Sequence, residues 1–215
     1  GNDDRVLAAD VRLILMDIVK LTILGNRDKI LEGLKKAGLK SGFEKINIIN
    51  PLKSEYSKDF VQTLYDLRKG KGLTMDMAED LIKDVSYFGT MMVYKDLADG
   101  MVSGAAHTTQ HTIKPALQFV KMKPSVSVVS SVFFMCLDDR VSVFGDCAIN
   151  PNPNAEQLAE IAISSAESSI AFGIEPRIAM LCYSSGSSGK GEEVDKVRKA
   201  TEIVKRKRPD LKIEG

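Results

Sequence analysis

The sequence is poor in the residues that build metal sites and disulfides. It contains two histidines, three cysteines and no tryptophan among 215 residues. A histidine-rich metal site is excluded, because His107 and His111 are the only imidazoles in the sequence. Cys136, Cys147 and Cys182 are an odd number, lack metal-type spacing and stand in apolar, strand-like contexts. We therefore expect them to be buried free thiols, and we expect no metal and no cofactor.

The sequence also lacks an excess of charge of either sign. It has 30 basic and 29 acidic residues, so neither a nucleic-acid partner nor a membrane surface is indicated. The one basic run, at residues 205–208, stands at the end of an expected helix, where positive charge complements the helix dipole. We find no signal-peptide pattern and no apolar run of membrane-spanning length. A cytoplasmic protein is therefore expected.

The residues that are present alternate between apolar runs and amphipathic stretches. This pattern is typical of an α/β fold with a largely parallel sheet. Hydrophobic residues make up 44% of the chain, which is enough to bury the core of one large or two small domains. Lys123 and Pro124 break the pattern, so we place a domain boundary there. We expect a first α/β domain with an anion-binding loop over residues 1–123. Residues 124–215 would form a second, incomplete α/β domain, because the chain stops inside an expected strand.

The expected elements follow from periodicity and capping signals. Helices are predicted over residues 4–19, 27–36, 109–121, 154–172 and 192–207, with a helix-rich stretch over 54–96. Strands are predicted over residues 21–24, 45–49, 101–103, 126–137, 141–144 and 178–181, and a further strand begins at 211. One face of the first helix is expected to carry Leu7, Val11, Ile14 and Ile18. Pro115 fits its helix only within the first turn. Asp138 and Asp139 predict a turn, so the strands beside them can form a hairpin.

Two loops rich in hydroxyl groups follow strand-like runs, and each precedes a helix. Residues 103–109 read SGAAHTT and lead to Thr112 and Lys114, and residues 184–189 read SSGSSG and lead to Lys190. Ligands of parallel sheets bind beyond the carboxyl ends of the strands, where small residues, hydroxyls and a helix N-terminus favour a phosphate. A helix cap and a turn are the alternative interpretation of each loop. Neither loop matches a Walker or a dinucleotide-binding fingerprint.

Arg68 stands at an expected helix end beside Gly70 and Gly72. Its guanidinium could hold a phosphate monoester through two parallel hydrogen bonds, or it could be a solvated charge at a helix end. The residues alone therefore indicate an α/β enzyme that handles a phosphorylated small molecule.

Several stretches resemble the phosphate acetyltransferase family. Residues 99–121, DGMVSGAAHTTQHTIKPALQFVK, resemble the family pattern DGxVSGAxHTTxxTIRPALQxxK. Residues 1–9 (GNDDRVLAA), 64–72 (LYDLRKGKG), 132–177 and 180–191 (MLCYSSGSSGKG) resemble the same family, in order and over essentially the whole chain. The related phosphate butyryltransferases and the acyltransferase-like domains of large malic enzymes usually lack the VSGAxHTT motif.

The resemblance implies a fold and a reaction. The fold consists of two three-layer α/β/α domains with largely parallel sheets and a cleft between them, like the isocitrate and isopropylmalate dehydrogenases, and family members are usually homodimers. The reaction is reversible acetyl transfer between acetyl-CoA and inorganic phosphate, in which the thiolate of coenzyme A attacks the carbonyl of acetyl phosphate directly. The partners are therefore coenzyme A, acetyl phosphate and inorganic phosphate, with coenzyme A as a substrate.

The resemblance also implies residue roles. Arg68 matches the arginine thought to hold the 3′-phosphate of the coenzyme, and residues 103–112 match the wall that receives acetyl phosphate. The expected substrate-binding residues are Arg68, Ser103, Thr108, Thr109, Thr112, Lys114, Ser184 and Ser185. We expect Lys114 to lie in the first turn of its helix and to point toward the same cleft as Thr108 and Thr109.

Two departures from the family pattern leave alternatives open. Lys114 stands where the family has an arginine, so a planar fork becomes a point charge. The NDLSRG-type motif, with its serine and the aspartate regarded as general base, is absent from the sequence, and losing a positioned base costs roughly 10²–10⁴-fold in rate. The alternatives are a phosphate butyryltransferase-type acyltransferase and a non-catalytic acyl-CoA-sensing regulatory domain. The intact VSGAAHTT loop argues against the regulatory domain, whereas Lys114 and the absent motif favour it.

We expect the coding sequence to continue past Gly215 for roughly 100 residues, about the size of a small domain. This segment should contain a Ser-Arg pair and, a few residues later, an aspartate. Sequencing downstream of the codon for Gly215 checks the expectation, and a natural stop codon at that point would contradict it.

Overall fold

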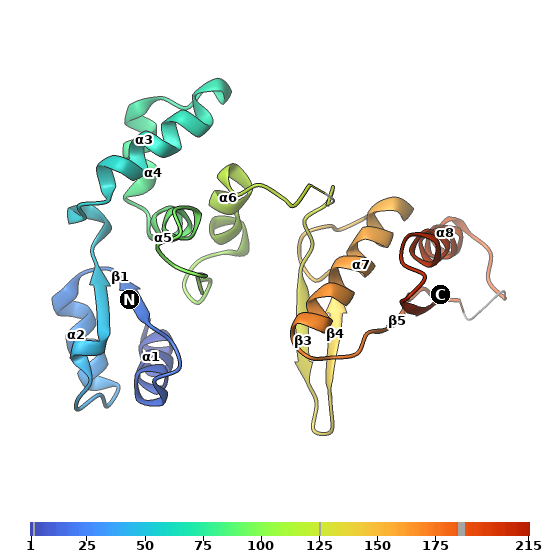
Figure 1. The fold of residues 1–215 in the computed structure, drawn as a ribbon, viewed down its shortest axis with the longest axis horizontal. Coiled ribbons are helices and arrows are strands. Elements are labelled where there is room, and N and C mark those ends of the chain that lie inside the picture. Colours follow the sequence, from blue (N-terminus) through green and yellow to red (C-terminus); the bar gives the residue numbers. More distant parts are fainter. Residues whose placement is uncertain (2, 125, 185–187) are drawn as a thin grey trace. The chain divides into compact units, whose positions relative to one another are not determined.

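A computed structural model describes residues 1, 3–124, 126–184 and 188–215, and its backbone contacts divide the chain into two compact units, Gly1–Lys121 and Met122–Gly215. The first unit contains α1 (Asp4–Met16), β1 (Leu21–Leu24), α2 (Arg27–Lys36), η1 (Phe43–Lys45), β2 (Ile46–Ile49), η2 (Pro51–Lys53), α3 (Ser57–Arg68), η3 (Lys69–Lys71), α4 (Met75–Ile82), α5 (Val85–Tyr94) and α6 (Thr109–Phe119) (Figure 1). The second contains β3 (Val132–Cys136), β4 (Val141–Gly145), α7 (Ala155–Ala171), β5 (Arg177–Ala179), α8 (Glu192–Lys207) and β6 (Lys212–Glu214).

The sheets are small and mostly parallel, so the predicted α/β class is confirmed. In the described part of the chain, β1 pairs with β2 and β5 pairs with β6, both in parallel. The β3 and β4 strands pair antiparallel, with Phe133 opposite Phe144. The turn predicted at Asp138 and Asp139 joins them, so the expected hairpin is confirmed as well.

The amino-terminal part of the first unit packs α1 and α2 with the β1–β2 pair. The side chain of Asp3 caps α1 by accepting the backbone N–H groups of Arg5 (2.9 Å) and Val6 (3.4 Å). The buried cluster consists of Leu7, Val11, Ile14, Ile23, Ile30, Leu34, Leu39 and Ile46. Ile18, predicted on the same helical face, is instead 62% exposed. The helix ends at Met16 because Asp17 adopts a left-handed conformation (φ 56°), which redirects the chain before Ile18.

Helices α3 to α6 form the second part of this unit. Figure 1 shows α3 and α4 side by side. The buried cluster shared by these four helices consists of Phe60, Leu64, Ala78, Ile82, Tyr87, Phe88, Met91, Met92 and Phe119. The hydroxyl of Thr74 caps α4 by accepting the N–H of Met77 (3.2 Å). Between α3 and α4 the chain turns at Gly72, which has the positive φ (83°) that glycine adopts without strain.

Two predicted elements of the first unit are wrong. Residues 101–103 form no strand, and Pro115 is the seventh residue of α6 instead of lying in the first turn. A proline at this position removes one helical hydrogen bond. Its ring is fully buried, so apolar packing offsets this loss and the helix continues to Phe119.

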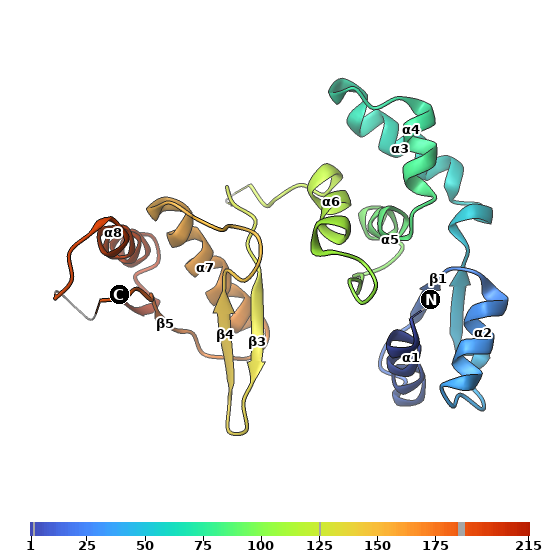
Figure 2. The ribbon, with the colours of Figure 1, turned by 180° about the vertical axis from the view of Figure 1, so that it is seen from behind.

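The second unit packs α7 against α8. Asn154 and Gln157 form a capping box that starts α7. The buried seam consists of Ala155, Ala159, Ala162, Ala166, Ala200, Ile203 and Val204, together with Leu211 and Ile213 from the β6 region. Helix α7 also lies along one face of the β3–β4 hairpin (Figures 1 and 2). A Cβ atom at Gly145 would collide with the Ser165 hydroxyl, so a larger residue there would force that hydroxyl to move.

The strand predicted over residues 126–137 shortens to Val132–Cys136. The reason lies at Ser131, whose backbone N–H donates to the Asp146 carboxylate (3.0 Å) instead of to a neighbouring strand. The expected burial of the cysteines is also wrong. Cys136 is exposed, Cys147 and Cys182 are half-buried, and all three are free thiols. Cys136 is exposed because it ends an outer strand of a two-stranded sheet.

The carboxylate of Asp146 organises the loop that leads into α7. It accepts hydrogen bonds from the hydroxyl (2.5 Å) and N–H of Ser131 and from the N–H (2.6 Å) and side-chain amide (2.7 Å) of Asn150. Partial burial alone would raise the pKa of Asp146, but the hydrogen bonds from Ser131 and Asn150 outweigh it. The pKa therefore lies well below its usual range.

We predict that Asp146→Ala lowers the free energy of unfolding by about 2–4 kcal/mol at neutral pH, because it leaves several partly buried donors unpaired. Because the folded-state pKa is depressed, this stabilisation is present above the unfolded-state value of about 3.9. It is lost as pH falls through the folded-state pKa. Urea unfolding of parent and variant at several pH values measures the difference.

Asp139→Ala is the matched control, because that exposed carboxylate pairs with its neighbour Arg140. It should change stability little. A difference between parent and Asp146→Ala that stays constant down to pH 2 would show that the ionised carboxylate is not the stabilising species.

Candidate functional site

Side chains of α3, α4, α5 and α6 meet at one pocket of about 410 Å³ in the first unit. Its lining residues are Arg68, Lys71, Gly72, Leu73, Met77, Asp80, Leu81, Tyr87, Lys114 and Gln118. The one carboxylate among them, Asp80, already pairs with Lys83 (3.0 Å). The pocket therefore joins positive charge to an apolar wall.

Three cations of this pocket have no carboxylate partner among the described residues. Arg68, Lys71 and Lys114 form no ion pair within the residues that the structure describes, whereas the nearby Lys69 pairs with Asp66 at 2.8 Å. Unpaired cations in a concave surface attract an anion, and a guanidinium beside ammonium groups suits phosphate oxygens.

Gln118 holds one side of the pocket in place. Its backbone carbonyl accepts a hydrogen bond from Arg68 Nη1 (3.3 Å), and its side-chain oxygen accepts one from the Tyr87 hydroxyl (2.9 Å). Burial raises the pKa of Tyr87, and the nearby carboxylate of Asp84 raises it further against the opposing effects of Gln118 and Arg68. Tyr87 is therefore a protonated donor at neutral pH. The sequence analysis missed Lys71, Tyr87 and Gln118. Gln118 could have been found, because it follows Lys114 by four residues and shares its helical face.

The hydroxyl loop lies at the start of α6. Ser103 is exposed, Thr108 caps the helix by accepting the N–H of His111 (3.2 Å), and Thr109 is its first residue. The hydroxyl oxygen of Thr112 is buried and has no hydrogen-bond partner within the described residues. Gly104 has a positive φ (109°), which allows the loop backbone to pass close to Thr112.

The expected orientation of Lys114 is wrong. It lies in the second turn of α6 and lines the pocket with Arg68, while Thr108 and Thr109 do not line that pocket. With about 3.6 residues per turn, Lys114 shares a face with Gln118 and points away from the face of Thr109. The structure thus brings Arg68 and Lys114 together and separates both from the hydroxyl loop.

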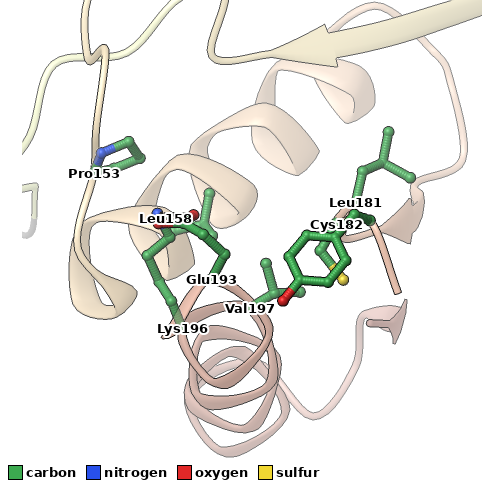
Figure 3. Close-up of a pocket in the computed structure, with 8 residues that line it drawn as sticks. Pro153, Leu158, Leu181, Cys182, Glu193, Lys196 and Val197 are labelled. Carbon is green, nitrogen blue, oxygen red and sulfur yellow. Dashed lines mark ion pairs between the residues drawn. The ribbon is translucent and has the colours of Figure 1, made fainter. Parts of the chain in front are cut away.

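The predicted serine loop belongs to the second unit. Ser184 is half-buried, and its hydroxyl lies 3.5 Å from that of Ser188, while Ser185 lies outside the described residues. The second unit also contains a pocket of about 320 Å³ (Figure 3). Its lining residues are Pro153, Leu158, Leu181, Cys182, Tyr183, Glu193, Lys196 and Val197. Its two charges neutralise each other through a contact of 2.6 Å between Lys196 and Glu193. This pocket is therefore largely apolar and offers an anion little attraction.

Nowhere in the described residues do three or more His, Cys, Asp or Glu side chains gather so that they could hold a metal ion. None of the described helices has the length and apolar character needed to cross a membrane.

An α/β fold with unpaired cations around one pocket defines a protein suited to a phosphorylated ligand. The chain belongs to the phosphate acetyl/butaryl transferase family, whose profile matches residues 1–215. It is 55% identical over 215 residues to a phosphate acetyltransferase of Synechocystis sp., covering 31% of that protein. It is 49% identical to a phosphate acetyltransferase of Corynebacterium glutamicum, covering 65% of it.

The solved structures include a similar fold. The crystal structure of a phosphotransacetylase from Streptococcus pyogenes matches all of this chain and 65% of its own, with a TM-score of 0.91 and 44% identity. The chain thus spans between about a third and two thirds of the length of these relatives.

We predict that Thr112→Val leaves the free energy of unfolding within about 0.5 kcal/mol of the parent or raises it. The buried hydroxyl makes no hydrogen bond within the described residues, so replacing it with a methyl group of similar shape removes no stabilising interaction. Thr90→Val is the matched control, since the buried Thr90 hydroxyl donates to the carbonyl of Ser86 (2.7 Å). The control should lose about 1 kcal/mol in urea unfolding. A loss at Thr112 as large as that at Thr90 would reveal a partner in the folded state, such as a buried water.

Proposed function

We propose that this chain is part of a phosphate acetyltransferase, an enzyme that transfers acetyl groups reversibly between acetyl-CoA and inorganic phosphate. The observation that carries the proposal is the meeting of Arg68, Lys71 and Lys114 at one pocket, in a chain that belongs to the phosphate acetyl/butaryl transferase family. Relatives in Synechocystis and Corynebacterium glutamicum that carry the name phosphate acetyltransferase support it.

The pocket of the first unit is proposed to hold the phosphate-bearing end of coenzyme A. Arg68 offers two parallel N–H groups to one phosphate, and Lys114 adds a point charge from the opposite helix. Leu73, Leu81 and the ring of Tyr87 supply an apolar surface beside these charges. The assignment moves Lys114 from acetyl phosphate, where the sequence placed it, to the coenzyme.

The hydroxyl loop is proposed to receive acetyl phosphate. Ser103, Thr108, Thr109 and Thr112 can donate to phosphate oxygens together with the free N–H groups of the first turn of α6. Ser184 and Ser185, in the serine loop predicted from the sequence, are proposed as further substrate-binding residues. In the reaction the sulfur of coenzyme A bonds to the acetyl carbon, the bond from that carbon to the phosphate oxygen breaks, and phosphate leaves. The base that removes the thiol proton is proposed to be the aspartate of the family's NDLSRG-type motif.

The two compact units are proposed to be the two three-layer α/β/α domains that the resemblance implies, of the isocitrate and isopropylmalate dehydrogenase-like type. The parallel pairing of β1 with β2 and of β5 with β6 supports this assignment.

We also propose a cytoplasmic homodimer. The ring of Phe134 packs on Phe172 at the end of α7 (4.3 Å), so Phe133, Met135 and Phe144 lie on the opposite face of the hairpin, where all three are exposed. A cluster of large exposed apolar side chains is typical of a surface that is covered in an assembly. Sedimentation equilibrium of the full-length protein tests this proposal, and a monomer at micromolar concentration would contradict it.

We predict that Arg68→Ala and Lys114→Ala, in a full-length protein that carries these residues, both raise KM for coenzyme A more than KM for acetyl phosphate. Contacts with a remote phosphate are made equally in the ground and transition states, so kcat should change little. Arg68→Ala should cost about 1.5–3 kcal/mol. Lys114→Arg should keep or improve the parent KM. Steady-state kinetics with coenzyme A and with dephospho-coenzyme A, which lacks the 3′-phosphate, measure the effect. The loss should shrink with the second substrate.

Lys69→Ala is the matched control, because Lys69 is paired with Asp66 and does not line the pocket. It should behave like the parent. Equal losses with both coenzymes would disprove the 3′-phosphate assignment, and a loss confined to acetyl phosphate would return Lys114 to the hydroxyl loop. Faster transfer of butyryl than of acetyl groups would identify a butyryltransferase. Binding of acyl-CoA without any transfer would support a regulatory domain.

A further inference from the structure

A chain of three side chains connects the start of α5 with the hydroxyl loop. The Oδ2 atom of Asp84 lies 3.0 Å from Nε2 of His111 in the first turn of α6. The ring of His111 stacks on that of His107, with centroids 4.8 Å apart and planes inclined by 20°. His107 belongs to the loop and immediately precedes the helix cap Thr108.

We propose that Asp84 is a positioning residue which acts through His111 to fix the orientation of His107 beside the hydroxyl loop. The inference rests on the proposed function, in which this loop receives a phosphate group. It assigns roles to Asp84 and His111, neither of which is among the expected substrate-binding residues.

The two oxygens of Asp84 have separate partners. Oδ1 caps α5 by accepting the N–H groups of Ser86 (2.9 Å) and Tyr87 (3.2 Å), which fixes the carboxylate to a helix start. Oδ2 is left for His111. An ionised carboxylate only accepts hydrogen bonds, so Nε2 of His111 must carry a proton. Asp84 thereby selects both the tautomer and the orientation of the His111 ring.

His111 is held at two points. Its backbone N–H donates to the hydroxyl of Thr108 (3.2 Å), and its ring is bound to Asp84. The ring is therefore a fixed flat surface for His107. The imidazole of His107 can donate an N–H to a phosphate oxygen, and a donor that is already oriented loses less freedom when the ligand binds.

The contact between Asp84 and His111 is poorly suited to a purely structural role. Capping of α5 needs only Oδ1, and the side chains of His111 and Asp84 are 41% and 29% exposed. Ion pairs with this exposure add little to folding stability. Loss of the contact should therefore change the geometry of the loop and leave the fold intact.

The test uses histidine NMR, because the chain contains two histidines and their ring signals are simple to assign. In the parent we expect Nε2 of His111 to be protonated and the His107 ring protons to be shifted upfield by stacking. Asp84→Asn keeps an oxygen for the cap but presents an N–H to His111, so the proton should move to Nδ1. His111→Gln removes the ring, so the stacking shift of His107 should disappear.

Binding of inorganic phosphate is followed on the amide signals of Thr109 and Gln110 in the same samples. Both variants should bind phosphate about threefold to tenfold more weakly than the parent, the range expected when one net hydrogen bond is lost. Thr74→Ala is the matched control, because it removes a helix cap in the same unit without touching either histidine. It should leave the His107 signals and phosphate binding unchanged.

Unchanged His107 signals in Asp84→Asn and His111→Gln would overturn the inference, as would an equal change in Thr74→Ala. Phosphate binding that is the same in the parent and both variants would also overturn it, because the orientation of His107 would then not matter to the ligand. The parent protein could fail to bind phosphate at this loop while the histidine signals of the variants change as expected. That result would contradict the proposed function and establish the positioning of His107.

Discussion

The docking of α6 on α5 is the interaction on which the candidate site depends. Phe119, at the end of α6, is almost fully buried and meets the ring of Tyr94 edge to face, with centroids 5.9 Å apart. A helix is stiff over this length, so anchoring one end determines where the other residues of the helix lie. Gln118 and Lys114 consequently reach the pocket, while the opposite end of α6 presents the hydroxyl loop. Displacing Phe119 would therefore disturb both regions at once.

The sequence predicted much of the fold where local signals were complete. The helices at 27–36 and 192–207 have the predicted bounds because an amphipathic pattern coincides with clear start and stop signals. The strand over 126–137 was predicted too long, because its apolar pattern gives no sign that Ser131 bonds to the distant Asp146. Such a side-chain partner replaces a strand neighbour only through the tertiary fold.

The candidate site was predictable residue by residue but not as an arrangement. Arg68 and Lys114 were singled out from the sequence, yet they are 46 positions apart, and the packing of α3 on α6 decides that they share a pocket. The orientation of Lys114 was misjudged because Pro115 was assumed to mark a helix start. Asp84 and His111 could not be connected from the sequence, since the contact depends on the approach of two helix starts.

The alanine seam of the second unit restricts how this part of the chain can change over evolutionary time. Ala155, Ala159, Ala162 and Ala166 lie where α7 packs in the buried cluster, and all four are almost fully enclosed. Extra methylene groups in such a seam typically cost about 1–3 kcal/mol each time the packing is forced apart. Substitutions there are limited by volume much more than by chemistry, so glycine or serine should recur among tolerated variants and branched residues should be rare.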